Sequence, residues 1–430
     1  MLQLRLGPQQ NAKLFLREPL VPGHYPYGAL HVKLAARPRY NGGVVDNLIR
    51  DVMNGCQTPL TSAIREEARR LGFFKVGIAQ VRPLPDPQRF DSWRADGMHG
   101  EMAYMSRRAA MRKAPALLLE DARSMVVLSI NYFHGAGLAA DALKGRISRY
   151  AWGEDYHRIV EGRLEELLAF IRSRAPAAHG LCFVDAGPVM EKVWGAQTRL
   201  GWMGKHSNLI TRELGSWFFL GVILLDLELE YDAAHGNYCG ACTRCIQVCP
   251  TGAIVAPYVV DARLCISYLT IELRGAIPRQ LRPLIGNRIF GCDDCQEVCP
   301  WNRFARSTSE EAFRPADGNH MPELTALAAL TPAGFEQRFR NSAIWRARRD
   351  GFVRNVVVAL GNSHSPSAIP ALDGALHDAS ALVRAHAAWA LEQIAHAGAR
   401  AALQKAAAQE TDPAVIEEIA LAMECSPGGR

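Results

Sequence analysis

Short apolar runs alternate with polar, turn-rich segments in the first half of the chain. The run Ser124–Asn131 is apolar almost throughout, which is typical of a buried strand. Further strands are predicted at Phe73–Ala79, Leu181–Val184 and Phe218–Leu225. We therefore expect one sheet in this part of the chain, with the folded protein beginning near Pro59.

Helical periodicity fills the intervals between these strands. The segment Thr61–Gly72 predicts a helix, with Thr61 or Ser62 as its N-cap and a glycine at its end. Further helices are predicted at Trp93–Met105 and Asp155–Ala175. Helices and strands that alternate in this way indicate a mixed α and β domain.

The pattern changes after Glu323, where the chain becomes rich in alanine and leucine. The segments Asn355–Gly361, Ala368–Leu376 and Leu382–Leu391 repeat one theme of short helices, a proline and an Asp-containing turn. Such helix pairs are typical of HEAT-type repeats. Two or three repeats cap themselves poorly, so we expect them to pack on the preceding domain.

Cysteines are concentrated between residues 239 and 299. The run Cys239–Pro250 has the C-x2-C-x2-C-x3-C-P spacing of bacterial two-cluster ferredoxins. The run Cys292–Pro300 has the same ending but lacks the leading C-x2, and Cys265 can supply the missing thiolate. In such proteins the fourth cysteine of a run ligates the other cluster.

This cross-over rule predicts the ligands of two 4Fe-4S clusters. The first set is Cys239, Cys242, Cys245 and Cys299, and the second set is Cys265, Cys292, Cys295 and Cys249. Zinc is the alternative, because zinc sites also use C-x2-C pairs. Nothing resembles a signal peptide, so we expect no disulfides and a cytoplasmic protein. The remaining cysteines are interpreted as free thiols: Cys56, Cys182 and Cys425.

Length and charge narrow the picture further. A chain of 430 residues allows about three domains. Its net charge of +6 is compatible with a polyanionic partner. No run approaches the roughly 18 uncharged apolar residues of a membrane span. Residues 1–57 are basic, poor in acids and rich in Pro and Gly, which favours a disordered arm or a translated upstream region over a transit peptide.

Two acids and one loop are candidates for chemistry. Asp155 lies in the segment SRYAWGEDYH, and Asp185 lies in FVDAGP directly after a predicted strand. Either acid could instead cap a helix or form a turn. The glycine-punctuated loop GWMGKHSN presents Lys205 and His206, which could contact a cofactor or phosphate or could belong to a surface loop.

One motif imitates a dinucleotide-binding site. Gly135–Ala140 matches G-x-G-x-x-A, and Asp155 follows at a nicotinamide-like distance. However, Asn131–His134 separates the glycines from the strand, and Gly145 would break the following helix. We expect a loop there.

Several segments together resemble the epoxyqueuosine reductase family, whose members are cobalamin-dependent tRNA-modifying enzymes related to reductive dehalogenases. The resemblance covers about residues 60–400. It rests on SRYAWGEDYH, FVDAGP, GWMGKHS, CISYLTIELRGAIP and GNRIFGCDDCQEVCPWN. Arg112 and Pro115 match the Arg-x-x-Pro that is common in the family.

The resemblance implies that epoxyqueuosine in tRNA is reduced to queuosine, the last step of queuosine biosynthesis. Electrons would pass through the two clusters to cob(II)alamin, with Asp185 as the proton donor and Asp155 as a nearby helper. An acid suits this chemistry because opening an epoxide leaves an alkoxide that must be protonated. The implied cobalamin contacts are Arg112, Ser148, Asp185, Lys205, His206, Ser207 and Ser267.

The same resemblance implies partners. These are the anticodon stem-loop of queuosine-type tRNAs and an electron donor protein such as flavodoxin or ferredoxin, and we expect a monomer. Arginines crowd into the entry to the helical tail, where they could bind tRNA phosphates or simply form a solvated face. They are Arg338, Arg340, Arg346, Arg348, Arg349 and Arg354.

Two rival functions remain open from the sequence. One is a corrinoid iron-sulfur oxidoreductase of the reductive dehalogenase type, and the other is a non-catalytic electron-transfer scaffold. In every case the predicted fold class is α+β. The predicted parts are an extension over 1–57, an α/β cobalamin-binding catalytic domain over 58–230, a two-cluster ferredoxin-like domain over 231–310, and HEAT-like helical repeats over 311–430.

Overall fold

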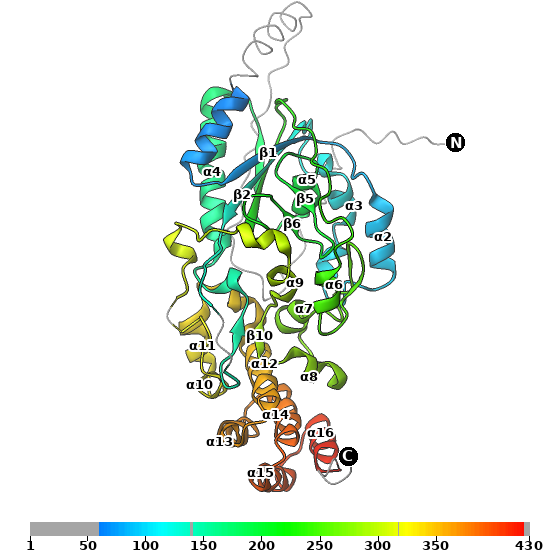
Figure 1. The fold of residues 1–430 in the computed structure, drawn as a ribbon, viewed down its shortest axis with the longest axis vertical. Coiled ribbons are helices and arrows are strands. Elements are labelled where there is room, and N and C mark those ends of the chain that lie inside the picture. The colour runs from blue at the N-terminus through cyan, green and yellow to red at the C-terminus, as the bar shows by residue number, and fades with distance from the viewer. Residues whose placement is uncertain (1–59, 138–140, 317, 425–430) are drawn as a thin grey trace, which may run out of the picture. The chain divides into compact units, whose positions relative to one another are not determined.

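The computed structural model describes residues 60–137, 141–316 and 318–424 (Figure 1). The predicted extension over 1–57 lies outside the described residues, as do positions 138–140 of the glycine motif. Residues 132–137 form a loop, which agrees with the expectation for that motif. No helix of the described part is both long and apolar enough to cross a membrane.

An antiparallel sheet organises the first part of the described chain. Its strands follow one another in the order β1 (Lys75–Gln80), β2 (Ser124–Asn131), β7 (Phe218–Leu225) and β4 (Gly180–Phe183). The β2–β7 ladder runs without a bulge along the full length of both strands. The predicted strands are confirmed, and β2 and β7 have the predicted bounds.

Helices cover both faces of this sheet. The face that carries Leu128 packs on α4 (Tyr156–Arg174) and on the helix over 60–70. The opposite face, which carries Val127, packs on α5 (Glu191–Ala196). Because neighbouring residues of β2 point to opposite faces, an apolar run without polar interruptions is what a doubly covered strand requires.

The helix over 60–70 differs from its prediction in one detail. Thr61 and Ser62 were predicted as caps but lie within the helix. The buried Thr61 hydroxyl accepts a hydrogen bond from the Glu230 amide at 3.1 Å, so it ties this helix to the segment that follows β7. Gly72, with φ of +88°, follows the end of the helix as predicted.

The helix predicted over Trp93–Met105 is wrong. The structure has α2 (Pro87–Ala95) and then a series of turns. Gly97 and Gly100 have φ of +66° and +56°, in the left-handed region that ends a helix. A Cβ at Gly100 would lie 2.5 Å from the Tyr268 hydroxyl, so this turn depends on a close approach from a distant segment.

Short elements connect the sheet to the helical tail. A parallel pair of strands joins β3 (Arg146–Ile147) to β10 (Arg288–Phe290). The cysteine-rich region contains α6 (Arg244–Val248), β8 (Ile254–Ala256), β9 (Val259–Val260), α7 (Ile266–Ile271), α8 (Arg282–Ile285) and α9 (Asp294–Glu297). Smaller elements before it are α3 (Ala109–Lys113), β5 (Trp202–Met203) and β6 (Leu209–Ile210).

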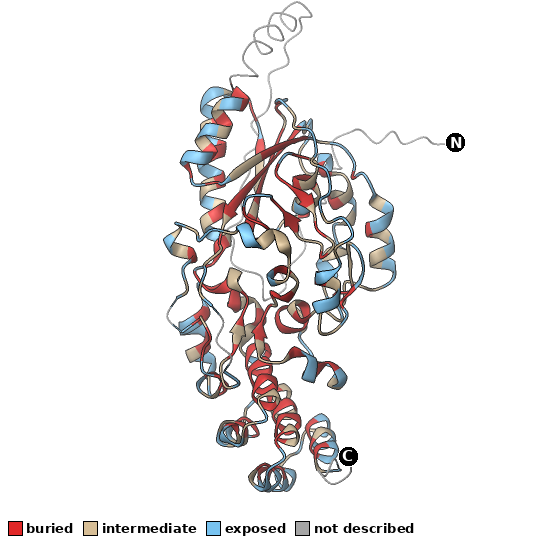
Figure 2. Ribbon diagram, in the orientation of Figure 1, coloured by how far each residue is buried: buried red, intermediate tan, exposed pale blue. Residues whose placement is uncertain are grey.

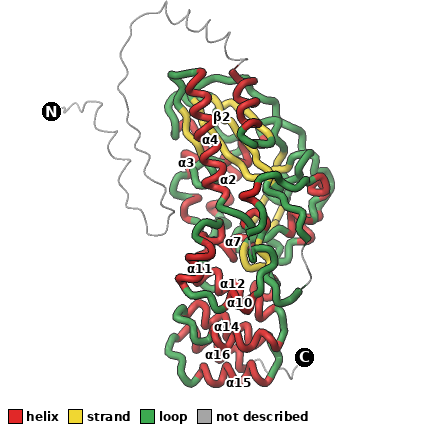
Figure 3. Tube along the Cα trace, turned by 90° about the vertical axis from the view of Figure 1, so that its left-hand side faces the viewer, coloured by secondary structure: helices red, strands yellow, loops and turns green. Residues whose placement is uncertain are grey.

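The remaining described chain is helical and stacks as predicted (Figure 3). Its helices are α10 (Leu324–Ala328), α11 (Pro332–Phe339), α12 (Arg348–Asn362), α13 (Ile369–Ala375), α14 (Ala381–Gln393), α15 (Ala397–Ala407) and α16 (Pro413–Glu424). Residues 351–361 of α12 are buried throughout (Figure 2). One side of α12 packs on α14, and other residues of α12 pack on α7, α8 and β10.

Arg354 shows that the arginine-rich segment is not one solvated or tRNA-binding face. Its side chain is fully buried in α12. The guanidinium donates hydrogen bonds to the carbonyl oxygens of Leu269 (2.7 Å), Leu273 (3.0 Å) and Gly275 (2.6 Å). Sequence spacing cannot separate such an arginine from an exposed one, and the expectation that Arg354 contacts tRNA is wrong.

Other arginines of this segment are also engaged with protein groups. Arg346 pairs with Glu272 at 2.7 Å, and Arg349 pairs with Asp378. Arg338 and Arg340 are exposed, whereas Arg348 is half-buried with its guanidinium 5.5 Å from the Trp345 ring centre. The positive charge that a large anion can reach is therefore smaller than the sequence suggests.

Candidate functional site

The predicted first set of cysteines comes together beside α6. Burial raises the pKa of the Cys245 thiol, and the thiols of Cys239, Cys299 and Cys242 raise it further. Burial also raises the pKa of Cys299, with Cys239 and Cys242 adding to the effect. These mutual effects indicate that the four thiols lie within electrostatic reach of one another, and Cys299 joins them from the second run, as the cross-over rule predicts.

The second set gathers around the start of α7. Burial raises the pKa of Cys295 well above its ordinary value, and Cys292 and Cys265 raise it further. Burial raises the pKa of Cys265 as well, and Cys249 from the first run adds to it. Ser267, a predicted cobalamin contact, lies in α7 two residues after Cys265. Repulsion among buried thiolates is relieved when they bind iron, so both sets suit metal clusters.

The fit to 4Fe-4S clusters rests on this grouping of thiols. Within the ranges 60–137, 141–316 and 318–424, no group of three or more His, Cys, Asp or Glu side chains is arranged to hold a single metal ion. Four iron atoms spread their thiolates more widely than one ion does. The described cysteines, including Cys182, are free thiols rather than disulfides.

Lys205 lies against the loop of the first cysteine set. Its ammonium donates hydrogen bonds to the carbonyl oxygens of Gly240 at 2.7 Å and Cys242 at 2.9 Å. Sequence reasoning made Lys205 a cobalamin contact. In the structure its charge fixes the loop that carries Cys239 and Cys242.

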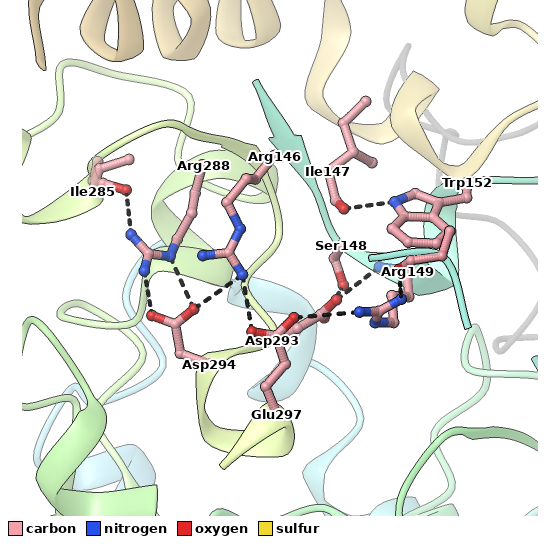
Figure 4. A network of polar contacts seen from close by, with 11 residues as sticks. Arg146, Ile147, Ser148, Arg149, Trp152, Ile285, Arg288, Asp293, Asp294 and Glu297 are labelled. Atoms are coloured by element: carbon pink, nitrogen blue, oxygen red, sulfur yellow. Dashed lines mark hydrogen bonds and ion pairs between the residues drawn. The ribbon is translucent and has the colours of Figure 1, made fainter. Parts of the chain in front are cut away.

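A polar network holds the second cysteine run in place (Figure 4). The Ser148 hydroxyl donates to the Asp293 carboxylate, and the Arg149 amide donates to the other oxygen of the same carboxylate at 2.8 Å. Arg288 pairs with Asp294. Because these two aspartates lie between Cys292 and Cys295, the network fixes the backbone that presents both thiols. The predicted cobalamin contact Ser148 is thus a neighbour of the second set.

Asp185 lies on the turn that follows β4, at the end of the sheet. Its φ of +56° is in the left-handed region, which is uncommon for a residue with a side chain. Such strain often marks a functional position. The Tyr156 hydroxyl donates a hydrogen bond to Asp185 Oδ2 at 2.6 Å. Asp185 is exposed, while Tyr156 is buried with its ring stacked 4.0 Å from that of Phe219. One oxygen of an accessible carboxylate is therefore held by a rigid phenol.

Asp155 has a different part in this site. Its carboxylate caps α4 by accepting a hydrogen bond from the His157 amide at 3.0 Å, and it lies 2.7 Å from His157 Nδ1. Burial raises the pKa of Asp155, but the hydrogen bonds and charge of His157 outweigh burial and lower it. Asp155 thus fixes the start of α4, where Tyr156 reaches Asp185.

Tyr150 connects Asp185 with the second cysteine set. Its ring centre lies 6.1 Å from that of Tyr156 and 6.0 Å from that of Phe290. Burial raises the pKa of Tyr150 well above its ordinary value, and the charges of Asp185 and Asp293 raise it further. A half-buried phenol that keeps its proton therefore lies between the candidate acid and the Cys292–Cys295 loop.

Arg112 and Glu191 are further titratable neighbours of Asp185. Arg112 Nη1 donates to the Gly187 carbonyl at 3.3 Å. Burial lowers the pKa of Arg112, whereas Glu191, Tyr104 and Asp185 raise it in part. Burial and then the Asp185 charge raise the pKa of Glu191 to about 8. Glu191 therefore retains its proton at neutral pH, while Arg112 stays charged.

The loop between β5 and β6 presents His206 in a neutral state. His206 is buried, and burial together with the Lys192 charge lowers its pKa to about 4. Its Nδ1 accepts a hydrogen bond from the Asn208 amide at 3.2 Å. Ser207, the next predicted contact, has φ of +60° in the same tight turn. This neutral ring can donate or accept hydrogen bonds without adding charge.

Unpartnered polar atoms test whether a large cofactor fits this region. Buried polar atoms normally have hydrogen-bond partners. Within the described residues, Arg112 Nε, Glu191 Oε1 and His206 Nε2 are buried and have none. A ligand with many amide groups, such as a corrinoid, can pair with such donors and acceptors. The residues present therefore fit cobalamin.

Sequence reasoning missed several residues of this site. Tyr150 and Tyr156 both lie within SRYAWGEDYH, beside the predicted Ser148 and Asp155, and Glu191 closely follows FVDAGP. In SRYAWGEDYH, polar and aromatic residues follow one another closely, and this pattern was the signal that could have indicated the two tyrosines. No sequence pattern around Tyr104 indicated that its hydroxyl lies within electrostatic reach of Asp185 and Arg112, because separate segments bring these groups near one another.

Known families match three segments of the chain. Residues 112–186 match the family described as epoxyqueuosine reductase QueG, and residues 238–302 match the 4Fe-4S double cluster binding domain. Residues 348–424 match HEAT repeats. These matches confirm the predicted pair of 4Fe-4S clusters and the HEAT-like tail.

Whole proteins show the same likeness. The epoxyqueuosine reductases of Xanthomonas campestris and Pseudomonas aeruginosa are each 42% identical over 342 residues, which cover 78% of this chain and 96% and 94% of theirs. A solved epoxyqueuosine reductase with a tRNA-Tyr epoxyqueuosine-modified stem loop has a TM-score of 0.80 and 28% identity, covering 85% of this chain and 98% of that chain. A solved Bacillus subtilis epoxyqueuosine reductase with its Asp catalytic loop swung out of the active site has the same TM-score and identity. This match covers 86% of this chain and 99% of that chain.

Proposed function

The chain belongs to the epoxyqueuosine reductase family, and from this membership we propose that it reduces epoxyqueuosine in tRNA to queuosine. The reaction removes the epoxide oxygen as water and leaves an alkene, which consumes two electrons and two protons. The observation that carries the proposal for this chain is the 2.6 Å hydrogen bond from Tyr156 to the accessible Asp185 carboxylate. Tyr150 links that pair to the second thiol set.

Cobalamin is the cofactor in this proposal, and when bound it supplies a strongly reducing cobalt(I). Arg112, Ser207 and His206 would hold it on one side with guanidinium, hydroxyl and neutral imidazole hydrogen bonds. Ser148 and Ser267 would contact it from the side of the second thiol set. The unpartnered Arg112 Nε and His206 Nε2 support this arrangement.

Proton delivery falls to Asp185 in this proposal. Opening the epoxide places negative charge on oxygen, and a positioned carboxylic acid can protonate that oxygen as the charge forms. Tyr156 holds one oxygen of the acid, so the other can face the substrate. The aspartate on the catalytic loop of the Bacillus subtilis relative supports a loop-borne acid, as Asp185 is here.

The test of the proposed function is direct turnover. The anaerobically reconstituted protein should convert epoxyqueuosine to queuosine in a tRNA that carries the precursor, as measured by mass spectrometry of the digested nucleosides. Unchanged epoxyqueuosine in the presence of both clusters, cobalamin and a chemical reductant would contradict the proposal.

Substitution of Cys265 tests the predicted ligand sets. Two clusters require about eight irons per chain. Cys265→Ser should lose about half of this iron, because Cys265 belongs to the second set although it lies outside both dense runs. Iron and sulfide analysis together with electron paramagnetic resonance of the reduced protein would measure the loss. Cys182→Ser is the matched control and should keep all the iron, and full iron content in Cys265→Ser would rule out the assignment.

The tRNA stem-loop is the proposed macromolecular substrate, and the relative solved with such a stem loop supports this choice. The exposed Arg338 and Arg340 are the candidates for phosphate contacts in the tail. Arg338 donates to the Gly318 carbonyl at 2.7 Å, and Arg340 forms an exposed pair with Glu336 at 3.4 Å. Such surface pairs cost little to exchange for a phosphate.

Charge reversal of these two arginines should weaken tRNA binding. We expect Arg338→Glu with Arg340→Glu to lower affinity roughly tenfold to hundredfold at low salt and to flatten its salt dependence, because fewer counterions are released. Fluorescence anisotropy with a labelled stem-loop at several salt concentrations would measure both. Arg69→Glu with Arg70→Glu reverses the same charge on another helix and is the control. Equal stem-loop affinity of both double variants would show that the tail arginines only form a solvated surface.

A further inference from the structure

Aromatic side chains flank both ends of the first cysteine set. Tyr238 directly precedes Cys239, and Trp301 follows Cys299 by two residues. The two rings meet edge to face with centres 6.1 Å apart, and Trp301 Nε1 donates to the Tyr238 carbonyl at 3.3 Å. Phe304 continues the row, with its ring centre 6.1 Å from that of Trp301. This row reaches solvent, since Tyr238 is 39% and Phe304 is 41% exposed.

A basic hollow adjoins this aromatic row. It has a volume of about 530 Å³, and Phe304 is part of its wall together with Arg212, Arg303 and Arg306. The Arg212 guanidinium lies 4.2 Å from the Tyr238 ring centre, which joins the hollow to the other end of the row.

The charge of the hollow is not balanced by neighbouring acids. Among the described residues, no ion pair is formed by Arg212, Arg303 or Arg306. The one acid in the wall, Glu213, pairs with Lys75 at 2.9 Å. Protein-binding surfaces are enriched in aromatic residues and arginine. Unpaired arginines beside exposed aromatic rings are therefore typical of such a surface.

The position of this surface points to its partner. The loop around Cys239 and Cys242 is exposed at Gly240, Ala241 and Thr243. In the second run, by contrast, both aspartates between Cys292 and Cys295 are buried. An electron that enters at the exposed loop therefore meets the first set before the second.

We infer that the surface formed by Arg212, Tyr238, Arg303, Phe304 and Arg306 docks a small acidic one-electron carrier protein of the flavodoxin or ferredoxin class. The inference rests on the proposed function, because the proposed reaction requires electrons. At each encounter the carrier loses one electron and the first cluster gains it, so two encounters supply the two electrons of one turnover. Opposite charges speed such encounters by about 10- to 1000-fold, and the acceleration is lost with salt.

Cluster reduction without tRNA tests this surface independently of turnover. Reduced bacterial flavodoxin is mixed anaerobically with the reconstituted protein, and cluster bleaching is followed by stopped flow. Arg303→Glu with Arg306→Glu should slow reduction at least tenfold at low salt and remove most of its salt dependence. Reduction by dithionite should stay at the wild-type rate, which shows that the clusters themselves are intact. The double variant Arg69→Glu with Arg70→Glu should resemble wild type in both reactions.

Two outcomes would overturn the inference. Equal slowing in the Arg69/Arg70 control would assign the effect to net charge alone. An unchanged flavodoxin rate together with weaker stem-loop binding would assign the surface to tRNA, whose bases can also stack on aromatic rings. Phe304→Ala extends the test without a change of charge, and it should slow the flavodoxin reaction while leaving dithionite reduction and stem-loop affinity as they are. Failure of turnover with normal cluster reduction would contradict only the proposed function.

Discussion

Asp185→Asn is expected to keep both clusters and to lose turnover by roughly 10²- to 10⁴-fold, the usual contribution of a general acid. The amide keeps the size of the side chain and can still accept the hydrogen bond from Tyr156, which is 2.6 Å long in the wild type. It cannot release a proton to the developing alkoxide. Single-turnover conversion of precursor-bearing tRNA, with iron content measured on the same samples, would check both parts of the expectation.

Two neighbouring substitutions separate proton donation from positioning. Tyr156→Phe keeps the ring that stacks on Phe219 and removes only the hydroxyl, so it should have a smaller effect on turnover than Asp185→Asn. Asp155→Ala should cost about 1 kcal/mol of stability, because α4 loses its N-cap side chain. If Asp185→Asn turned over at the wild-type rate, the donor would lie elsewhere, and the protonated Glu191 would be the first group to examine.

The second large effect is expected from Arg354→Met. The substitution retains an unbranched side chain but leaves the carbonyl oxygens of Leu269, Leu273 and Gly275 without their donor inside the protein. Unsatisfied buried groups cost about 1–3 kcal/mol each. Allowing for relaxation, we expect a loss of roughly 3–5 kcal/mol in the free energy of unfolding.

The same variant should disturb the second cluster before the first. Leu269 lies in α7, whose N-cap is Cys265, and the adjacent Asn355 donates to Thr270 at 2.8 Å and to Ile289 at 2.9 Å, next to the strand end that leads to Cys292. Thermal unfolding followed by circular dichroism would measure stability, and electron paramagnetic resonance would report each cluster. Arg340→Met, at an exposed position, is the control, and its free energy of unfolding should lie within about 0.5 kcal/mol of the wild-type value. A variant as stable as this control, with an unchanged second cluster signal, would show that Arg354 is dispensable.

Elements whose form is set by their own residues were predictable. The uninterrupted apolar run of β2 and β7 requires burial on both faces, and the period of α4 places one apolar stripe on the sheet, so all three were found close to their observed bounds. The segment Trp93–Met105 failed because helix-forming residues surround two glycines whose left-handed turn is set by packing against Tyr268. Propensity within the segment cannot reveal a contact with a residue so distant in sequence.

The same distinction applies to the candidate site. Features set by local sequence could be predicted, and features set by contacts between distant segments could not. Ligand spacing is local, so two ligand sets could be predicted from the sequence alone, and a turn after a strand indicated Asp185 as a candidate. The effects of Tyr104 and Glu191 depend on their proximity to Asp185 and Arg112, which several separate segments bring about. Arg354 was misjudged for the same reason: its charge is visible in the sequence, whereas the carbonyl groups that surround it come from the cysteine-rich region.

The contacts of α12 also bear on the order in which the protein can mature during synthesis. A nascent chain that has emerged through residue 300 already carries all eight predicted ligand thiols. The hydrogen bonds from Arg354 and Asn355 to the segments around Cys265 and Cys292 form only after a further fifty or so residues have left the ribosome, at about 5–20 residues per second. During that interval the second set lacks the support of α12. Machinery that inserts iron and sulfide would therefore gain a fully supported second site only on a chain whose helical tail has begun to fold.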